Sequence, residues 1–525
     1  MSALRFEVLR FSDENLWRAL SNPHVSPAEV RTHGRAKYLH RYLASLKAQS
    51  IVVEADYTDG DYLDDYASYY VKCFTDYDRR CKRLHFFKTL FHDDADFLRK
   101  IHGHANKEEE SKLESDYLGF VVARPLPQAI VGRTILRTYE SDNGRRNYTC
   151  TRPYTANLFG LELTLPSLAF QEQDTVLAAC ATVSLWSCFQ KTAQLFGKSA
   201  PTPAAITRVA TQAVHHGRPI PSHGLMTSEI CAAIRHVELE PEVFTIRPSL
   251  PVVSLIYSYL KMGLPVILGV EIEGVGGHAI TIAGYSISDQ RRRPQEVAGS
   301  SSGVNLVGLR LDAFFSHDDH IGPFSKVVIK PAAKFGEKVF PVCFESDWVD
   351  QDTGRKLPLY PHVVIVPVYH KIRLTFLDVM EWLTGLNAVL KLVVPPSSPM
   401  EWDVHLMPSN EYKKLIRATE TIRDDLRERI LLTQQPRFIW RAKLLVGGVD
   451  GAELLFDATG ISRSFPMHEI VWLREDLAVR VKQIVDSSQL EPILVKFLTR
   501  QFLDFIKRSI HDQFAPPALF PGNSK

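Results

Sequence analysis

The stretch Gln171-Glu-Gln-Asp-Thr-Val-Leu-Ala-Ala-Cys-Ala-Thr-Val-Ser-Leu-Trp186 places a cysteine at the start of an apolar segment, with two glutamines a few residues upstream. A thiol at the beginning of a helix lies near the positive end of the helix dipole and near unpaired N–H groups, which favour the thiolate. Most free cysteines are small buried hydrophobes, so partners are needed before Cys180 counts as a nucleophile. The stretch predicts a helix that begins at Cys180 and makes this residue the first candidate.

A hairpin downstream of this helix offers a general base. Residues 263–272 have the pattern of a strand, residues 273–277 that of a glycine-containing turn, and residues 278–285 that of a second strand. We expect His278 at the bend of this hairpin, where its imidazole would be exposed rather than buried. Seen alone, a histidine beside glycines is more often an ordinary turn residue.

Two carboxylates follow the next strand. A polar surface loop is expected over residues 290–302 and a strand over residues 305–311, after which comes Phe315-Ser-His-Asp-Asp-His-Ile-Gly-Pro-Phe324. A carboxylate at the exit of a strand suits a residue that orients an imidazole and stabilises its charged form. Asp318 and Asp319 both fit this role, and the sequence does not separate them.

The order of these residues resembles that of the papain-like cysteine peptidases, and within them the bacterial peptidase C39-like group. In that group a Gln precedes a Cys at a helix start, a Gly-His pair follows on a strand, and an Asp comes after the next strand. The resemblance covers roughly residues 117–330. It implies an oxyanion-hole glutamine, a nucleophile, a general base and an orienting acid at Gln173, Cys180, His278 and Asp318, respectively.

Three departures from the family pattern leave two alternatives open. The interval from Gln173 to Cys180 is one residue longer than is usual, so Gln171 is the alternative oxyanion-hole residue. Ala181 stands where a Gly commonly follows the cysteine. Asp319 stands where a Pro often follows the acid, so it remains the alternative to Asp318.

The resemblance implies an α+β fold with a papain-like core, in which the helix bearing the nucleophile packs on an antiparallel sheet. It also implies a cysteine-dependent hydrolase that cleaves a peptide or isopeptide bond through a thioester acyl-enzyme. An acyltransferase or amidase is the first alternative, because formation of the acyl-enzyme does not specify whether water or an amine resolves it. A catalytically inert scaffold that binds protein partners is the second.

Changes in composition divide the chain into three regions. Residues 1–115 are expected to be mainly helical, with a helix start at Ser26-Pro27, and a charge-rich segment at 107–116 marks their end. Residues 116–332 form the expected catalytic domain, which begins with an apolar strand at Tyr117. Residues 333–525 mix strand and helix patterns, including a helix over 411–428, and form an accessory α/β region.

The composition is that of an ordinary globular protein and excludes several classes. The chain has 525 residues, of which 45% are hydrophobic and 23% charged, and a formal net charge of +2. This charge gives no general electrostatic reason for binding nucleic acid or a membrane surface. Seven scattered cysteines suit a reducing compartment, and no apolar run approaches the roughly 18 residues of a membrane span. We therefore expect a cytoplasmic protein.

The expected chemistry also bounds the partners. Cys-His-Asp acyl transfer needs neither a metal ion nor a cofactor, so we expect neither. The expected partners are a protein or peptide substrate and a regulatory protein that binds the two flanks. Large flanks around a peptidase core suggest, by analogy, a regulated bacterial stress or defence effector.

Overall fold

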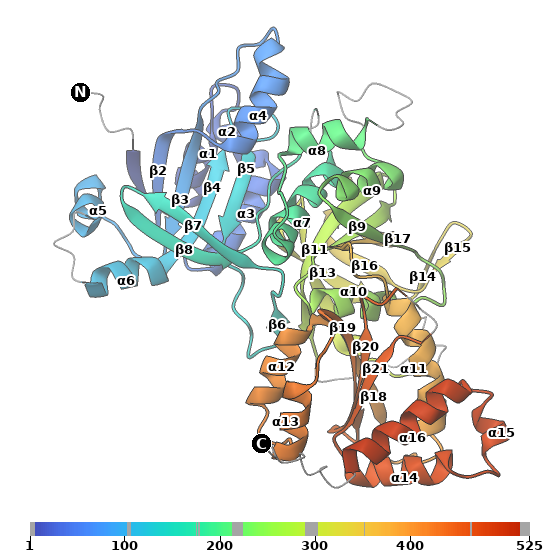
Figure 1. Ribbon diagram of the computed structural model, residues 1–525. Coiled ribbons are helices and arrows are strands. Elements are labelled where there is room, and N and C mark those ends of the chain that lie inside the picture. Colours follow the sequence, from blue (N-terminus) through green and yellow to red (C-terminus); the bar gives the residue numbers. More distant parts are fainter. Residues whose placement is uncertain are drawn as a thin grey trace.

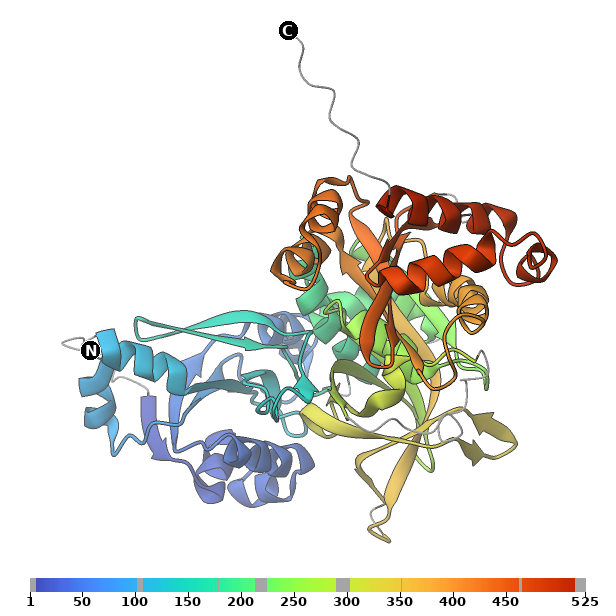
Figure 2. The same cartoon turned by 90° about the horizontal axis from the view of Figure 1, so that it is seen from below.

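Three larger antiparallel sheets organise the part of the chain that the computed structural model describes. The described residues are 6–101, 107–174, 176, 179–212, 224–288, 303–350, 352–461 and 465–514, so the loop expected over 290–302 lies outside them. In Figure 1 the first sheet is blue to cyan, the central one green to yellow and the last orange to red. Figure 2 shows from a second direction that the first and last sheets both border the central one.

The N-terminal sheet has the strand order β1-β2-β3-β4-β5. Its strands are β1 (Phe6–Arg10), β2 (Ser50–Tyr57), β3 (Cys81–Phe87), β4 (Tyr117–Ala123) and β5 (Val131–Leu136). The accompanying helices are α1 (Asp13–Leu20), α2 (Pro27–Thr32), α3 (Gly34–Ser45), α4 (Gly60–Ser68), η1 (Tyr70–Lys72), α5 (Asp94–Ile101) and α6 (Lys107–Asp116). As the sequence predicts, Ser26 caps α2 and Pro27 occupies its first turn.

Helices form most of the regular structure in residues 1–115, as expected, but the strands β1, β2 and β3 were not predicted. Strand β4 was expected to open the catalytic domain, but it pairs with β3, so the sheet crosses the boundary placed at 115. All seven residues of β4 are buried. This burial fits its apolar sequence and its position between β3 and β5, inside the sheet rather than at an edge.

The central sheet closes into a six-stranded barrel. Its strands follow the order β10 (Val266–Ile272), β11 (Gly276–Ile287), β12 (Leu311–Asp318), β13 (Gly322–Lys330), β16 (Cys343–Val349) and β17 (Lys356–Tyr369), and β17 pairs back with β10. Two further strands, β6 (Arg146–Asn147) and β9 (Leu239–Thr245), pair with β11 and β17. Separate two-stranded ribbons are formed by β7 (Arg152–Leu158) with β8 (Leu161–Ser167) and by β14 (Ala333–Phe335) with β15 (Lys338–Phe340).

The α+β class is confirmed, but the sheet behind the cysteine helix is larger than expected. The papain-like core was placed within residues 116–332, whereas the barrel continues through β16 and β17 to Tyr369. Closure gives both edges of the sheet a partner strand, which an open sheet ending at β13 would lack.

Helix α7 (Cys180–Phe196) packs against strand β11. It begins at Cys180, as predicted, and ends at Gly197, which has φ +64°. The buried Ser184 hydroxyl donates to the carbonyl of Ala279 at 2.9 Å, and the Thr281 hydroxyl donates to the carbonyl of Ser184 at 2.9 Å. The other helices of this part are α8 (Pro203–Ala210), α9 (Thr227–His236), α10 (Val252–Leu260) and η3 (Val307–Arg310).

The C-terminal sheet, ordered β18-β19-β20-β21, forms the third part. Its strands are β18 (Met400–Pro408), β19 (Phe438–Val446), β20 (Val449–Asp457) and β21 (Met467–Trp472). Its helices are α11 (Phe376–Leu390), α12 (Ser409–Ala418), α13 (Asp424–Leu432), α14 (Glu475–Val485), α15 (Glu491–Leu494) and α16 (Arg500–Phe514), so the helix expected over 411–428 is two helices. Among the described residues, no helix has both the length and the apolar character needed to cross a membrane.

Gly119 in β4 provides a test of the N-terminal sheet. Its φ is +112°, and a Cβ atom there would lie 1.9 Å from the carbonyl oxygen of Ile135. We expect Gly119→Ala to lower the free energy of unfolding by about 1–3 kcal/mol or more, because strained backbone and a backbone clash combine. Denaturant unfolding of the full chain measures this.

Gly34→Ala is the matched control. Gly34 begins α3, and no neighbouring atom lies within 4 Å of a Cβ placed there. We expect this variant to unfold within about 0.5 kcal/mol of the wild type or to be slightly more stable. Equal unfolding midpoints for the two variants would contradict the packing described for β4 and β5.

Candidate active site

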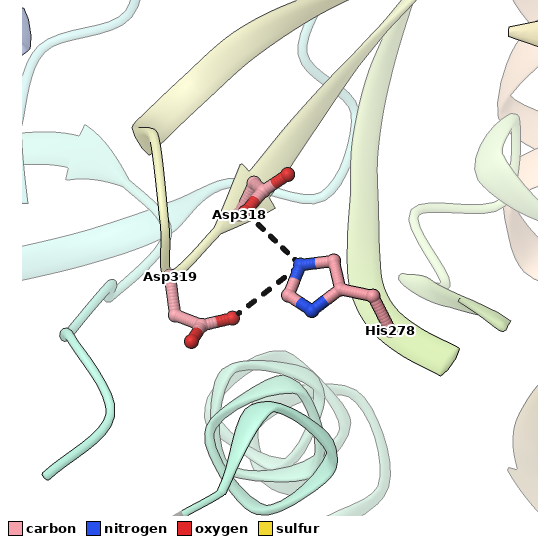
Figure 3. A group of neighbouring side chains, drawn as sticks. All are labelled: His278, Asp318 and Asp319. Atoms are coloured by element: carbon pink, nitrogen blue, oxygen red, sulfur yellow. Dashed lines mark hydrogen bonds and ion pairs between the residues drawn. The ribbon is translucent and has the colours of Figure 1, made fainter. Parts of the chain in front are cut away.

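The cysteine and histidine found in the sequence lie next to each other in the fold. Cys180 is the first residue of α7, and the His278 side chain comes from β11, the strand on which α7 packs. An interaction with the Cys180 side chain is among the causes that raise the pKa of His278, so the thiol lies within reach of the ring. Figure 3 shows one ring nitrogen of His278 facing two aspartates and the other directed toward the helix drawn below it.

His278 is buried, contrary to the expectation of an exposed residue at a bend. Strand β11 begins at Gly276, two residues earlier than predicted, and His278 pairs with Val270 inside the ladder. The side chain is only 4% exposed. Burial within the sheet fixes the ring in one orientation and shields its interactions from water.

Asp318 is the carboxylate that orients the imidazole. It is the last residue of β12. The strand predicted over 305–311 is wrong, because residues 307–310 form the helix η3 and the strand covers the segment after it. His278 Nε2 donates to Asp318 Oδ1 at 3.1 Å, and Trp348 Nε1 donates to Asp318 Oδ2 at 2.8 Å. The backbone N–H of His320 also donates to Asp318 Oδ1, at 3.0 Å. Asp319 Oδ1 lies 3.7 Å from His278 Nε2, which is within ion-pair distance but too long for a normal hydrogen bond.

The charges of this cluster favour an imidazolium beside a carboxylate. Burial disfavours the charged imidazole, but the charge of Asp318 and the hydrogen bonds with Asp318 and Cys180 raise the pKa of His278 well above its ordinary value. Burial opposes ionisation of Asp318 too, yet His278 and Trp348 lower the pKa of this acid. Burial raises the pKa of Asp319 to about 7. The two aspartates therefore differ in their ionisation as well as in their hydrogen bonds.

Gln173, rather than Gln171, reaches the cluster. Its side-chain nitrogen lies 2.9 Å from His320 Nε2. Burial and the charge of His278 lower the pKa of His320 to about 4, so this ring is neutral near pH 7 and its Nε2 accepts from the Gln173 amide. A glutamine amide has two N–H groups, so within the described residues one is left beside the N–H that His320 accepts. The side chain of Gln171 is buried, and its Nε2 has no partner within the described residues.

The sequence reasoning missed His320 and Trp348. The ring of His320 lies 5.3 Å from that of His278 and 4.9 Å from that of Trp348, measured between centroids. His320 lies two residues after Asp318 in the sequence, and this closeness could have indicated that it belongs to the site. Trp348 lies on β16, outside the domain expected for the site, and gave no local signal.

The N-terminal part contacts two segments of the site, the one that carries Gln173 and the turn that follows Asp318. Glu172 accepts from the backbone N–H of Val131 at 3.0 Å, and its other carboxylate oxygen pairs with Arg35 Nε at 2.7 Å. Tyr38 donates to the carbonyl of Pro323 at 2.8 Å, beside the turn that follows Asp318. The flank therefore supports the glutamine segment and the acid turn from one side.

The arrangement is suited to nucleophilic acyl transfer. A thiol at a helix start, an imidazole within its reach and a carboxylate on the far ring nitrogen are the parts needed to form and resolve a thioester. The first turn of α7 has no acidic residue, and its N-cap Ala179 makes no side-chain capping bond. Within the described residues, the first-turn N–H groups are thus available to a developing oxyanion. In contrast, burial raises the pKa of five other cysteines, namely Cys81, Cys150, Cys188, Cys231 and Cys343.

Comparison with protein-family models, with curated proteins and with solved structures finds no match to this chain.

Histidine titration tests the electrostatics of the site. The raised pKa of His278 means that its imidazole keeps the proton well above pH 6.5, whereas burial lowers the pKa of His317 to about 3 and that of His320 to about 4. We expect NMR of histidine-labelled protein to show His278 still charged at pH 7 and the other two neutral. Assignment uses His278→Gln and His320→Gln. A neutral His278 at pH 6 would contradict the ion pair with Asp318.

Proposed function

We propose that this chain is a cysteine-dependent hydrolase with a papain-like catalytic core, which cleaves a peptide or isopeptide bond through a thioester. One arrangement carries the proposal: Cys180 begins α7, which packs on β11, and His278 of that strand interacts with the Cys180 side chain while its Nε2 donates to the buried Asp318. The helix-on-antiparallel-sheet arrangement supports the papain-like assignment, and the closed barrel is a feature of this chain beyond that pattern.

The reaction follows from the positions of these groups. The Cys180 thiolate attacks the carbonyl carbon, and the amide C=O becomes an oxyanion that the Gln173 amide and first-turn N–H groups of α7 stabilise. Imidazolium His278 gives its proton to the leaving amine as the C–N bond breaks, which leaves a thioester on Cys180. Water then attacks this thioester while His278 accepts a proton, and the acid product and the thiol are released.

The partners and the location form part of the proposal. The substrate is a protein or peptide, and the flanks bind a regulatory protein. All seven cysteines lie in the described residues and are free thiols, which supports the cytoplasm as the site of action.

Selective alkylation tests the nucleophile. We expect limiting iodoacetamide to modify Cys180 about tenfold faster than the other six cysteines, because thiolates are the reactive form. Peptide mass spectrometry after a time course measures each site. Cys180→Ala should abolish the fast phase, and Cys188→Ala, which removes a fully buried thiol of the same helix, should leave it intact.

Equal and slow modification of all seven cysteines would instead support an inert scaffold. Trapping on Cys180→Ala identifies the substrate of an active enzyme. Product masses measured with and without an added amine then separate hydrolysis from acyl transfer, because only a transferase yields the amide as its main product.

His320 is expected to act by positioning Gln173. We expect His320→Phe, which keeps a ring between His278 and Trp348 but removes the acceptor, to lower kcat for p-nitrophenyl acetate roughly tenfold or more with little change in KM. His320→Gln, which keeps an acceptor, should restore part of the rate. The double variant His320→Phe/Gln173→Ala should be no slower than Gln173→Ala alone, since the two residues act as one unit. Additive losses would show that His320 does not work through Gln173.

A further inference from the structure

Asp319 is a buried carboxylate that the proposed reaction does not use. Its side chain is 1% exposed, and within the described residues neither of its carboxylate oxygens receives a hydrogen bond from another residue. Oδ1 faces His278 Nε2 at 3.7 Å, and Oδ2 lies 3.9 Å from His320 Nε2. Burying a carboxylate without donors is unfavourable unless a cation compensates its charge, and the His278 ring is the charged group that faces Asp319 at 3.7 Å. A divalent cation between the two carboxylates would compensate the charge of both.

The three donor groups have the spacing of a metal site. His278, Asp318 and Asp319 each offer one atom, and these atoms lie within 4.8 Å of one another. Figure 3 shows both carboxylates directed at the same ring nitrogen. The distances from Nε2 to Asp318 Oδ1 and Asp319 Oδ1 are 3.1 and 3.7 Å. Bonds of about 2.0–2.1 Å at a tetrahedral zinc ion place its ligands about 3.3 Å apart, so these separations need little adjustment.

The donor set also indicates which ion fits. One imidazole nitrogen and two carboxylate oxygens suit zinc, whereas magnesium and calcium prefer oxygen ligands alone. Three protein ligands leave a fourth position for water. Among the described residues this is the one group of three or more His, Cys, Asp or Glu side chains with such spacing.

We propose that His278, Asp318 and Asp319 bind a zinc-class divalent cation that inhibits the cysteine chemistry; the inhibition, unlike the binding, rests on the proposed function. The ion binds the Nε2 lone pair of His278, and the hydrogen that Asp318 accepts leaves to solvent as a proton. The ring then carries its hydrogen on Nδ1 and has no lone pair with which to accept the proton of the Cys180 thiol. Binding of the ion and activation of the nucleophile are therefore mutually exclusive.

The position of the cluster is compatible with entry of an ion from solvent. Asp319 belongs to the turn between β12 and β13, and the neighbouring His320 side chain is 36% exposed.

Binding is measured first, on full-length protein that lacks the thiol. Zinc chloride is titrated calorimetrically into Cys180→Ala, into Cys180→Ala/Asp319→Asn and into Cys180→Ala/Asp347→Asn. Asp347 is the matched control, because it is a 52% exposed acid on β16 that pairs with Arg41. We expect one zinc ion per chain, an affinity roughly tenfold or more weaker in the Asp319→Asn variant, and no change in the Asp347→Asn variant. Circular dichroism checks that all three are folded.

Inhibition is measured next, as the rate of Cys180 alkylation by iodoacetamide with and without zinc. Each variant is compared with its own zinc-free rate. We expect zinc to slow alkylation of Cys180 in the otherwise unchanged protein and in Asp347→Asn. In Asp319→Asn, most of this slowing should be absent.

The two proposals fail in different ways. Equal zinc affinity in the presence and absence of the Asp319 carboxylate, or no binding by Cys180→Ala, would overturn the metal site. Absence of selective Cys180 alkylation without zinc would overturn the hydrolase, while the calorimetric comparison would still decide the metal site.

Discussion

The contact between helix α7 and strand β11 is the interaction on which the site depends. Ser184 and Thr281 exchange hydrogen bonds across this contact with backbone carbonyls, and Ala279, one of the acceptors, directly follows His278. These bonds fix the position of α7 along the axis of β11. Because Cys180 lies one helical turn before Ser184, that position sets the distance between the thiol and the imidazole. A helix shifted by one residue along β11 would separate the two groups.

The flank is part of the active-site structure rather than an appended module. Phe170 pairs with Thr134, and the backbone N–H of Glu172 donates to Val131, so the segment carrying Gln173 continues the edge of the N-terminal sheet. On the other side, Tyr38 reaches the turn after Asp318, and a Cβ on Gly322 would lie 2.2 Å from the Tyr38 ring. Movement of the N-terminal part would thus reach both Gln173 and the acid, which gives a partner bound there a route to control the site.

Adjacent aspartates acquire different roles from their surroundings. Asp318 accepts hydrogen bonds from His278, His320 and Trp348, which stabilise its charge in a buried position. Asp319 has the same residue type and burial but none of these donors, so burial dominates and raises its pKa to about 7. One carboxylate thereby serves the histidine directly, while the other is left available to a cation. Sequence spacing alone does not encode this distinction, because it arises from donors on β16 and on the turn.

The sequence by itself determined two local features, a helix that begins at Cys180 and a strand that carries His278. The strand that ends at Asp318 lies after the segment 305–311 for which a strand was predicted. The helix start and the His278 strand follow from hydrophobic periodicity and turn residues, which act over a few positions. Closure of the barrel by β17, burial of His278, and the selection of Asp318 and Gln173 over their neighbours were decided by tertiary structure. Trp348 and the N-terminal sheet, both distant in sequence, supply those contacts. Their effect depends on distances in space, which local patterns do not contain.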